Sequence, residues 1–269
     1  MYKVIASMFT GLALSACGAG TSIAPYASSA NPAVSNTKIY DDGAGVVTVS
    51  RLDENGNPSQ GVLASTDVNI ASEIASGSYS LVATSSSSNG NYYSVVREGA
   101  AANGSALTVT TFGENLNSSG SEYASLSIVG INNTLGILTT GTTAQMRPSG
   151  TYIYGGNAVV VDSLNETAEG SFTLSASFDS NIASLTASTL ASDSSNNTAY
   201  FFSGNNILID QSDGSFSTSN GLIGKTGVRS ESASVKGYFS GLTAKGVHGI
   251  AYTNNSASPD LLGAFYGSR

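Results

Sequence analysis

Hydrophobic and polar residues follow three different patterns along the 269-residue chain. Residues 4–14 form an uncharged, mostly apolar run, and residues 18–36 are rich in Gly, Ala, Ser, Thr, Pro and Asn, again without charge. Beyond residue 37, apolar and polar side chains alternate in short stretches that stop at Gly, Asn, Asp or Ser, as Ala124, Leu126 and Ile128 do within residues 122–129. Because successive side chains of a strand point to opposite faces, this period of two predicts half-buried strands.

The alternating stretches predict strands in both halves of the chain. In the N-terminal half they cover residues 46–51, 79–84, 92–97, 107–112 and 122–129. In the C-terminal half they cover residues 151–154, 158–162, 171–178, 182–188, 199–202, 207–210, 234–239, 247–252 and 261–266. Turns are expected at Tyr154-Gly155-Gly156-Asn157 and Ser212-Asp213-Gly214-Ser215. Residues 66–74 have the features of a short helix, with Thr66 as its N-cap.

This succession of strands predicts an all-β protein. Eight or nine short strands within about 120 residues favour a small closed antiparallel barrel over residues 148–269, since closure removes the edges that an open sheet exposes. Residues 37–147 are predicted to form a smaller, less regular β-rich domain, with the boundary near residues 145–150. The alternative is a single continuous β-sandwich.

The first residues have the three parts of a secretory signal. Lys3 supplies the charge, residues 4–14 the apolar run, and Leu14-Ser15-Ala16-Cys17 a cleavage site of small residues. The apolar run has about half the roughly 20 residues that a membrane span needs. The ending at Cys17 resembles the lipobox of bacterial lipoproteins, which implies removal of residues 1–16 and acylation of Cys17. Residues 17–36 would then be the lipidated cysteine and a flexible tether.

The lipobox resemblance also implies a location. Several acyl chains on Cys17 would hold the protein stably at a membrane, because each buried methylene contributes about 0.8 kcal/mol. Gly18 follows the cysteine, where an aspartate resembles an inner-membrane retention signal, so the outer membrane is favoured.

Charge and cysteine content narrow the possible partners. Removal of Lys3, one of ten basic residues against 18 acidic ones, changes the net charge from −8 to −9. Such an acidic chain does not suit nucleic acid, which requires clustered Lys and Arg. Residues 225–269 are the exception, with a net charge of +3, and are interpreted as solvent-facing strand charges or as a patch that steers an acidic partner. Cys17 is the sole cysteine, which excludes an intramolecular disulfide and a thiolate zinc site.

Glycine–aromatic patterns near the C-terminus resemble a known family. They lie in Gly237-Tyr238-Phe239-Ser240-Gly241, followed by Ala244 and Gly249, and in Gly263-Ala264-Phe265-Tyr266-Gly267. Together with Gly170-Ser171-Phe172-Thr173-Leu174, they are similar to motifs of the barrel domain of transferrin-binding protein B and its relatives. The resemblance covers roughly residues 148–269 and implies an eight-stranded antiparallel barrel preceded by the family's handle domain. It further implies a surface lipoprotein that captures an extracellular protein or an iron- or haem-carrying solute.

The motif residues also have a physical interpretation that is independent of the family. A glycine in a barrel strand permits a bend, and a nearby aromatic ring fills the space left by the missing side chain. We therefore interpret Gly237, Phe239, Gly241, Ala244, Gly249, Gly263, Phe265 and Gly267 as core and corner residues with no ligand contact.

Residues able to support catalysis or metal binding are scarce. His248 is the sole histidine and is interpreted as structural, since a haem or metal role would need partners such as Tyr238 or Tyr252. No nucleophile elbow, P-loop or zinc motif is present. Residues 53–57 and 210–214 superficially resemble calcium loops but lack the full ligand series, so both are interpreted as turns. No cofactor, metal or catalytic residue is predicted.

Three functional hypotheses follow from these observations. The first is an outer-membrane, surface-exposed lipoprotein that binds an extracellular protein or an iron- or haem-carrying solute without catalysis. The second is a periplasm-facing structural or envelope-associated lipoprotein, and the third is a carboxylate-dependent hydrolase. For the first, Tyr92-Tyr93 and the pair Tyr152 and Tyr154 are candidate aromatic contact residues, with burial in the sheet core as the alternative.

Overall fold

The protein was analysed as a computed structural model, and nearly all of its described residues are strand. The described ranges are residues 38–41, 46–52, 58–65, 78–87, 90–100, 104–131, 134–164, 166–191, 199–254 and 261–269. Within these ranges the structure contains no helix that could serve as a membrane span. The short helix expected at residues 66–74, the leader, Cys17 and the tether lie outside the described residues.

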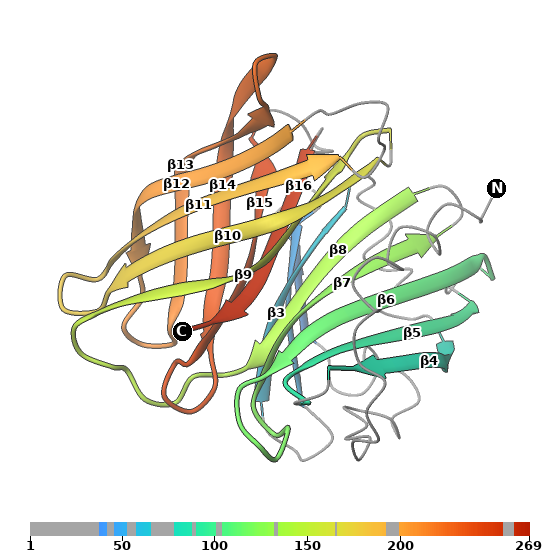
Figure 1. The fold of residues 1–269 in the computed structure, drawn as a ribbon, viewed down its shortest axis with the longest axis horizontal. Helices are drawn as coiled ribbons and strands as arrows, with labels where there is room; N and C mark the ends of the chain where they lie inside the picture. The colour runs from blue at the N-terminus through green and yellow to red at the C-terminus, as the bar shows by residue number, and fades with distance from the viewer. Residues whose placement is uncertain are drawn as a thin grey trace.

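The first eight strands form one open antiparallel sheet (Figure 1). They are β1 (Lys38–Asp41), β2 (Val46–Leu52), β3 (Pro58–Ser65), β4 (Ser78–Ser86), β5 (Tyr92–Ala100), β6 (Ala106–Asn115), β7 (Tyr123–Ile131) and β8 (Thr134–Thr142). Their order across the sheet is β1-β2-β3-β8-β7-β6-β5-β4, so β8 returns to pair with β3 and places β4 at one edge.

The next eight strands form a closed antiparallel barrel, as the sequence predicts. They are β9 (Thr151–Asp162), β10 (Thr167–Ser177), β11 (Ile182–Ala191), β12 (Ala199–Ile209), β13 (Ser215–Lys225), β14 (Arg229–Ser240), β15 (Gly246–Thr253) and β16 (Leu261–Ser268). Each strand pairs with the next, and β16 closes the barrel by pairing with β9. The all-β fold with a closed eight-stranded barrel is therefore confirmed, and a single sandwich is not formed.

The barrel strands are longer and more continuous than the sequence suggested. The turn expected at Tyr154-Gly155-Gly156-Asn157 is wrong, because these residues lie within β9. All four pair with β10, and the last three also pair with β16. The two strands expected at residues 199–202 and 207–210 form the single strand β12, whose pairing with β13 is interrupted between Ser203 and Leu208. Strand β13 was not predicted at all. The turn at residues 212–215 is confirmed, with the amide of Gly214 donating to the carbonyl of Asp210.

Aromatic rings fill the barrel interior by lying over glycines on adjacent strands. Phe216 on β13 is paired with Gly237 on β14, and a Cβ at that glycine would lie 2.5 Å from the Phe216 ring. Phe265 on β16 is likewise paired with Gly249 on β15, where a Cβ would lie 2.7 Å from the ring. The missing side chains thus make the room that the neighbouring rings occupy, which is a recognised way of building a curved sheet.

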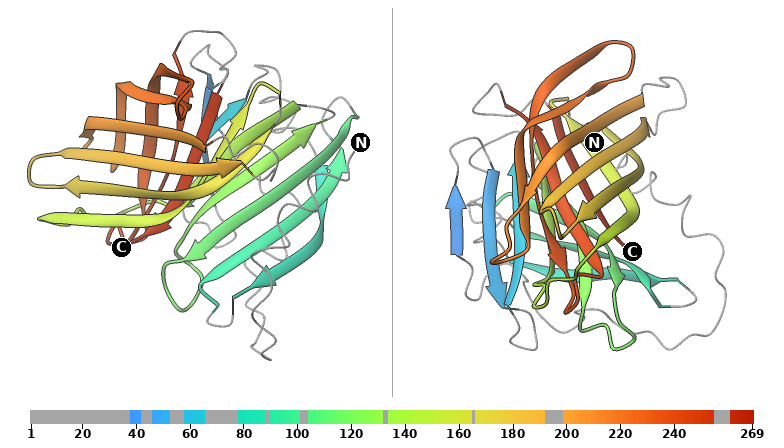
Figure 2. Two further views of the ribbon diagram at one scale, coloured as in Figure 1. Left: turned by 45° about the horizontal axis from the view of Figure 1, so that its top comes forward. Right: turned by 90° about the vertical axis from the view of Figure 1, so that its left-hand side faces the viewer.

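The open sheet packs against the outer wall of the barrel (Figures 1 and 2). The contact is apolar: Leu126 and Ile128 of β7 and Ile137 of β8 belong to one buried cluster with Val159 and Leu262 of the barrel wall. Burial of such side chains contributes roughly 1.5–3 kcal/mol each. The sheet contacts the wall mainly through its central strands, and the edge strand β4 lies away from the barrel.

Candidate functional site

The barrel has one end at which the chain enters it from the sheet. We call this the linker end, and it comprises the linker, residues 143–150, and the turns at residues 178–181, 210–214 and 241–245. Backbone hydrogen bonds attach the linker to the last of these turns, with the amides of Gln145 and Met146 donating to the carbonyl of Leu242. The Leu242 amide donates in turn to the carboxylate of Glu122, which directly precedes β7 of the open sheet. The turn after β14 is therefore the point at which linker, sheet and barrel meet.

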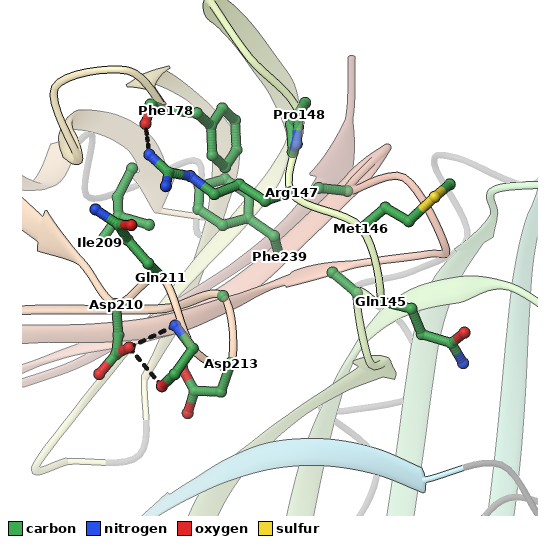
Figure 3. A pocket seen from close by; sticks show the side chains of 14 residues that line it. Gln145, Met146, Arg147, Pro148, Phe178, Ile209, Asp210, Gln211, Asp213 and Phe239 are labelled. Atoms are coloured by element: carbon green, nitrogen blue, oxygen red, sulfur yellow. Dashed lines mark hydrogen bonds between the residues drawn. The ribbon is translucent and has the colours of Figure 1, made fainter.

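A hollow of about 60 Å³ lies at the linker end (Figure 3). Its apolar lining includes Phe178 and Phe239, whose ring centroids are 4.8 Å apart. The Arg147 guanidinium extends across these rings and donates to the carbonyl of Phe178 (Figure 3). It also donates to the side chain of Asn181. The side chains of Met146 and Gln145 point away from the hollow. The site is thus a small apolar depression beneath a cationic side chain, and it is too small to enclose a drug-sized ligand.

Exposed apolar side chains surround this hollow. Leu208 on β12 is 68% exposed and is directly paired with Ile182 on β11, so the two side chains lie side by side on the outer wall. Ile153 on β9 is 67% exposed, and Met146 and Leu242 are exposed on the linker and the adjacent turn. Half of the ten exposed large apolar residues in the described part of the chain therefore belong to this end of the barrel.

Sequence reasoning missed this surface, although the sequence carries a signal for it. The neighbours of Leu208 are the buried Ile207 and Ile209, so Leu208 falls on the outward phase of the strand. Ile182 shares the outward phase of β11 with serine and threonine residues. The available signal was a single branched apolar residue among the outward-facing polar positions of a strand. Both residues were instead counted as part of the apolar pattern that predicted the strands.

The acidic loop at residues 210–214 is a turn, as expected. Asp210 accepts hydrogen bonds from the amide and hydroxyl of Ser212, and these bonds lower the pKa of its carboxyl. Asp213 accepts from the amide of Ser215. Both carboxylates therefore stabilise their own loop, and the described part of the chain holds no group of three or more His, Cys, Asp or Glu residues arranged for a metal. The other candidate loop, residues 53–57, lies outside the described residues.

The family-motif residues occupy the barrel interior and the turn at the linker end. Phe239 and Phe265 are fully buried in the barrel core. Gly241 has φ of 78° and Ala244 has φ of 54°, so both sit in the left-handed region within the turn. Ala244 also accepts a hydrogen bond from the buried Tyr154 hydroxyl through its carbonyl oxygen.

The remaining motif glycines are sites of close approach between strands. A Cβ at Gly263 would lie 2.7 Å from the Phe202 ring, and a Cβ at Gly267 would lie 2.2 Å from the carbonyl oxygen of Gly155. None of these positions offers a side chain to a ligand, since each glycine is buried against the neighbouring strand or ring.

His248 lies between the barrel and the open sheet. Its ring stacks on Tyr238 with centroids 5.9 Å apart, and it is almost fully buried. A Cβ at Gly141 of β8 would lie 2.7 Å from the imidazole, so the sheet packs directly on the histidine. These contacts fit a packing role at the interface.

The tyrosines proposed as contact residues divide between core and surface. Tyr154 is fully buried in the barrel and Tyr93 is buried in the open sheet, so neither can contact a partner. Tyr152 is partly buried beneath the Arg269 guanidinium, 3.7 Å from its ring centroid. Tyr92 is 45% exposed. Of the four candidates, Tyr92 has the most accessible ring.

Several polar residues lie together where the open sheet meets the barrel wall, a region that we call the seam. Glu114 of β6 accepts a 2.8 Å hydrogen bond from the hydroxyl of Ser268 on β16, and Tyr92 is paired directly with Glu114. Asn157 of β9 donates to the hydroxyl of Tyr266 on β16. Burial raises the pKa of Glu114, and burial raises the pKa of Glu169 on β10 to about 7. Burial is the main cause of the raised pKa of Tyr266, and the nearby Glu114 and Glu169 carboxyl groups raise it further.

Glu169 is expected to make the protein less stable as the pH rises. In the unfolded chain this carboxyl ionises near pH 4.5, whereas burial in the folded protein delays ionisation to about pH 7. Between these values the folded protein holds a proton that the unfolded chain has lost, so stability falls over that window. Because Glu169 is partly exposed, we expect a loss of about 1–2 kcal/mol.

Urea unfolding at pH 5 and pH 8 measures this effect in the wild type and in Glu169→Gln. The glutamine variant is expected to lose less stability between the two pH values than the wild type does. An identical loss in both proteins would assign the pH dependence to other groups.

Comparison with known proteins gives matches among solved structures. One match is a double mutant from Haemophilus parasuis Hp5, with 14% identity and a TM-score of 0.44, covering 86% of this chain and 52% of that chain. A second is from serogroup B Neisseria meningitidis, with 10% identity and a TM-score of 0.38, covering 87% of this chain and 65% of that one. A third is the intact Ap-TbpB with N and C lobes, with 14% identity and a TM-score of 0.41, covering 86% and 53%. All three are transferrin-binding protein B structures.

These structural neighbours belong to the same family that the glycine–aromatic motifs of the sequence resemble. The chain spans less than two thirds of the length of each of these neighbours. No protein family and no curated protein matches the sequence.

Proposed function

We propose that this protein is an outer-membrane lipoprotein, anchored through Cys17, that binds an extracellular protein at the linker end of its barrel without catalysing a reaction. The observation that carries the binding role is the group of exposed apolar side chains Ile153, Ile182 and Leu208 on the barrel wall. Exposure of such side chains to water is unfavourable, and a partner that covers them lowers the free energy by removing apolar surface from water.

The surroundings of these residues suit a protein contact. The cross-strand neighbours of Ile153 and Ile182 are Ser175 and Ser177, so small polar side chains separate the apolar ones. Arg147 supplies a cation beside them. An apolar centre with a polar surround is the usual composition of a protein–protein interface.

The anchor rests on the sequence. The Leu14-Ser15-Ala16-Cys17 lipobox and the following Gly18 support acylation of Cys17 and delivery to the outer membrane. A polar, uncharged tether over residues 18–36 would let the two β-rich parts stand off from the lipid.

Protease shaving of intact cells tests the cellular side of this proposal. The β-rich body is expected to be degraded while a periplasmic protein survives, and a Cys17→Ala variant is expected to leave the membrane fraction. A body that resists protease until the outer membrane is opened would overturn the surface location and favour the periplasm-facing alternative.

Paired variants test the binding surface. Wild-type protein is expected to retain a partner from extracellular fluid, and the double variant Ile182→Asp with Leu208→Asp is expected to lose it, because each new charge would have to be desolvated in the interface. Val228→Asp is the matched control, since Val228 is exposed in the turn at the opposite end of the barrel. Equal retention by all three proteins would show that the linker end is not the binding surface.

A further inference from the structure

The edge of the sheet–barrel contact carries the seam cluster, which we define as Tyr92, Glu114, Asn157, Glu169 and Tyr266. The five residues come from five different strands, β5 and β6 of the sheet and β9, β10 and β16 of the barrel wall, and Tyr266 is paired with Asn157. Tyr92 and Glu114 are paired in register, and Glu114 is paired with Ala124, which belongs to the buried sheet–barrel cluster. The two side chains therefore share the barrel-facing side of the sheet.

The two carboxyl groups of the seam cluster have no ion pair among the described residues. The ion pairs found there join Lys225 to Asp162 and Arg229 to Glu231, at distances of 3.6 and 3.0 Å. The one basic residue of β5, Arg97, occupies the opposite phase of that strand from Tyr92 and hence the other face of the sheet. The seam cluster therefore places two carboxyl groups near each other with no ion pair to stabilise their ionised forms, in agreement with the raised pKa of both groups.

Glu114 is the most unusual member of the cluster. Its side chain is 8% exposed, and its Oε1 atom accepts the bond from Ser268. Its Oε2 atom is buried and lacks a hydrogen bond of normal geometry, although the Tyr92 side chain lies near enough to lower the pKa of the carboxyl group against the larger, opposite effect of burial. A buried carboxylate oxygen without a donor is costly, so such atoms in folded proteins call for an explanation.

We propose that the seam cluster binds an arginine side chain carried by an exposed segment of the partner protein. A guanidinium has several donors in a fixed plane, which can satisfy an unpaired carboxylate oxygen. It also stacks on aromatic rings, and Tyr92 presents an exposed ring beside Glu114. This inference rests on the proposed binding function and adds the chemistry of one contact.

The composition of the cluster favours an organic cation over a metal ion. Divalent metals in proteins take several oxygen or nitrogen ligands, whereas the described residues include no group of three acidic, histidine or cysteine side chains placed for one. Two carboxyl groups accompanied by tyrosine rings are instead the surroundings in which cationic side chains are held.

Binding of a cation here should also depend on pH. A positive charge favours the ionised form of a neighbouring carboxyl group. Because the pKa of Glu169 is raised to about 7 in the free protein, this group must lose its proton before it attracts the guanidinium fully. Affinity is therefore expected to be higher at pH 8 than at pH 6.

Fluorescence anisotropy with a labelled synthetic Arg–Gly peptide tests the inference, with the corresponding Gln–Gly peptide as the uncharged control. The wild type is expected to bind the Arg–Gly peptide and to bind it more tightly at pH 8 than at pH 6. Tyr92→Ala, Glu114→Gln and Glu169→Gln are each expected to weaken binding about tenfold or more. Thermal unfolding of each variant checks that its fold is intact.

Glu98→Gln is the matched control. Glu98 is exposed and lies on the same phase of β5 as Tyr92, about 20 Å farther along the strand at 3.3 Å per residue. If Glu98→Gln weakens binding as much as Glu114→Gln does, general charge attraction explains the binding and the inference is wrong. Failure of the wild type to bind the peptide would also overturn the inference. If the linker end still retained a protein partner in that case, the proposed function would stand and only the arginine contact would be wrong.

Discussion

Replacing Phe239 with alanine is expected to lower the free energy of unfolding by about 3–5 kcal/mol. Phe239 is 1% exposed, and its ring centroid lies 5.3 Å from Tyr154, 4.8 Å from Phe178 and 5.2 Å from Phe216. The substitution removes the ring on which the other three converge and leaves a cavity that the closed barrel cannot collapse to fill. Urea unfolding followed by circular dichroism measures the loss.

Phe239→Leu provides the comparison for this experiment. Leucine keeps most of the apolar volume, so its cost is expected to be about 1–1.5 kcal/mol. A loss below about 1 kcal/mol for the alanine variant would mean that the linker end of the barrel is loosely packed, contrary to the ring contacts described above.

A Gly156→Ala substitution is expected to destabilise the protein by about 2–3 kcal/mol through overpacking. A Cβ at Gly156 would lie 2.3 Å from the carbonyl oxygen of Tyr266 and 2.7 Å from the Cα of Gly267, both on β16. These are backbone atoms, so the pairing of β9 with β16 that closes the barrel would have to shift. Thermal unfolding of the variant measures the effect.

The neighbouring Gly155 supplies a control at the next position. A Cβ there meets only the carbonyl oxygen of Phe172, at 3.8 Å, which is an ordinary contact. Gly155→Ala is expected to be neutral or to stabilise by up to about 1 kcal/mol, because alanine restricts the unfolded chain. Equal losses in the two variants would contradict the close approach of β9 and β16.

These two glycines also show where reading the sequence succeeded and where it failed. The alternation of apolar and polar residues predicted most barrel strands and the all-β fold, because a strand with one buried face must repeat every two residues. Gly155 and Gly156 were interpreted as a turn because paired glycines usually mark one. In the folded protein they remain in β9, since Phe172 on β10 needs the space above Gly156.

Strand β13 was missed for a different reason. Its sequence, SFSTSNGLIGK, has few apolar residues, and its inward positions include Gly221. The strand is held by its two neighbours in the barrel and by the single large ring of Phe216, which contacts Phe239 and Phe265. Tertiary context of this kind leaves no periodic signal in the strand itself.

The candidate sites depend on contacts that no local pattern contains. The seam hydrogen bond joins Glu114 to Ser268 across 154 positions. Ile182 and Leu208 become neighbours only through the pairing of β11 with β12. By contrast, the turn at Asp210 could be anticipated, because Asp, Ser and Gly close together in sequence favour a turn through local hydrogen bonds.

The closure of the barrel by β9 and β16 has a consequence for the order of events in the cell. Asp162 pairs with Leu261 and Gly155 with Ser268, so the two closing strands meet across roughly 100 residues of intervening chain. Contacts between such distant segments form slowly, because a long loop must be ordered before they are made. The hairpins between consecutive barrel strands can therefore form before β9 and β16 meet, and closure of the barrel is expected to be the late step of folding.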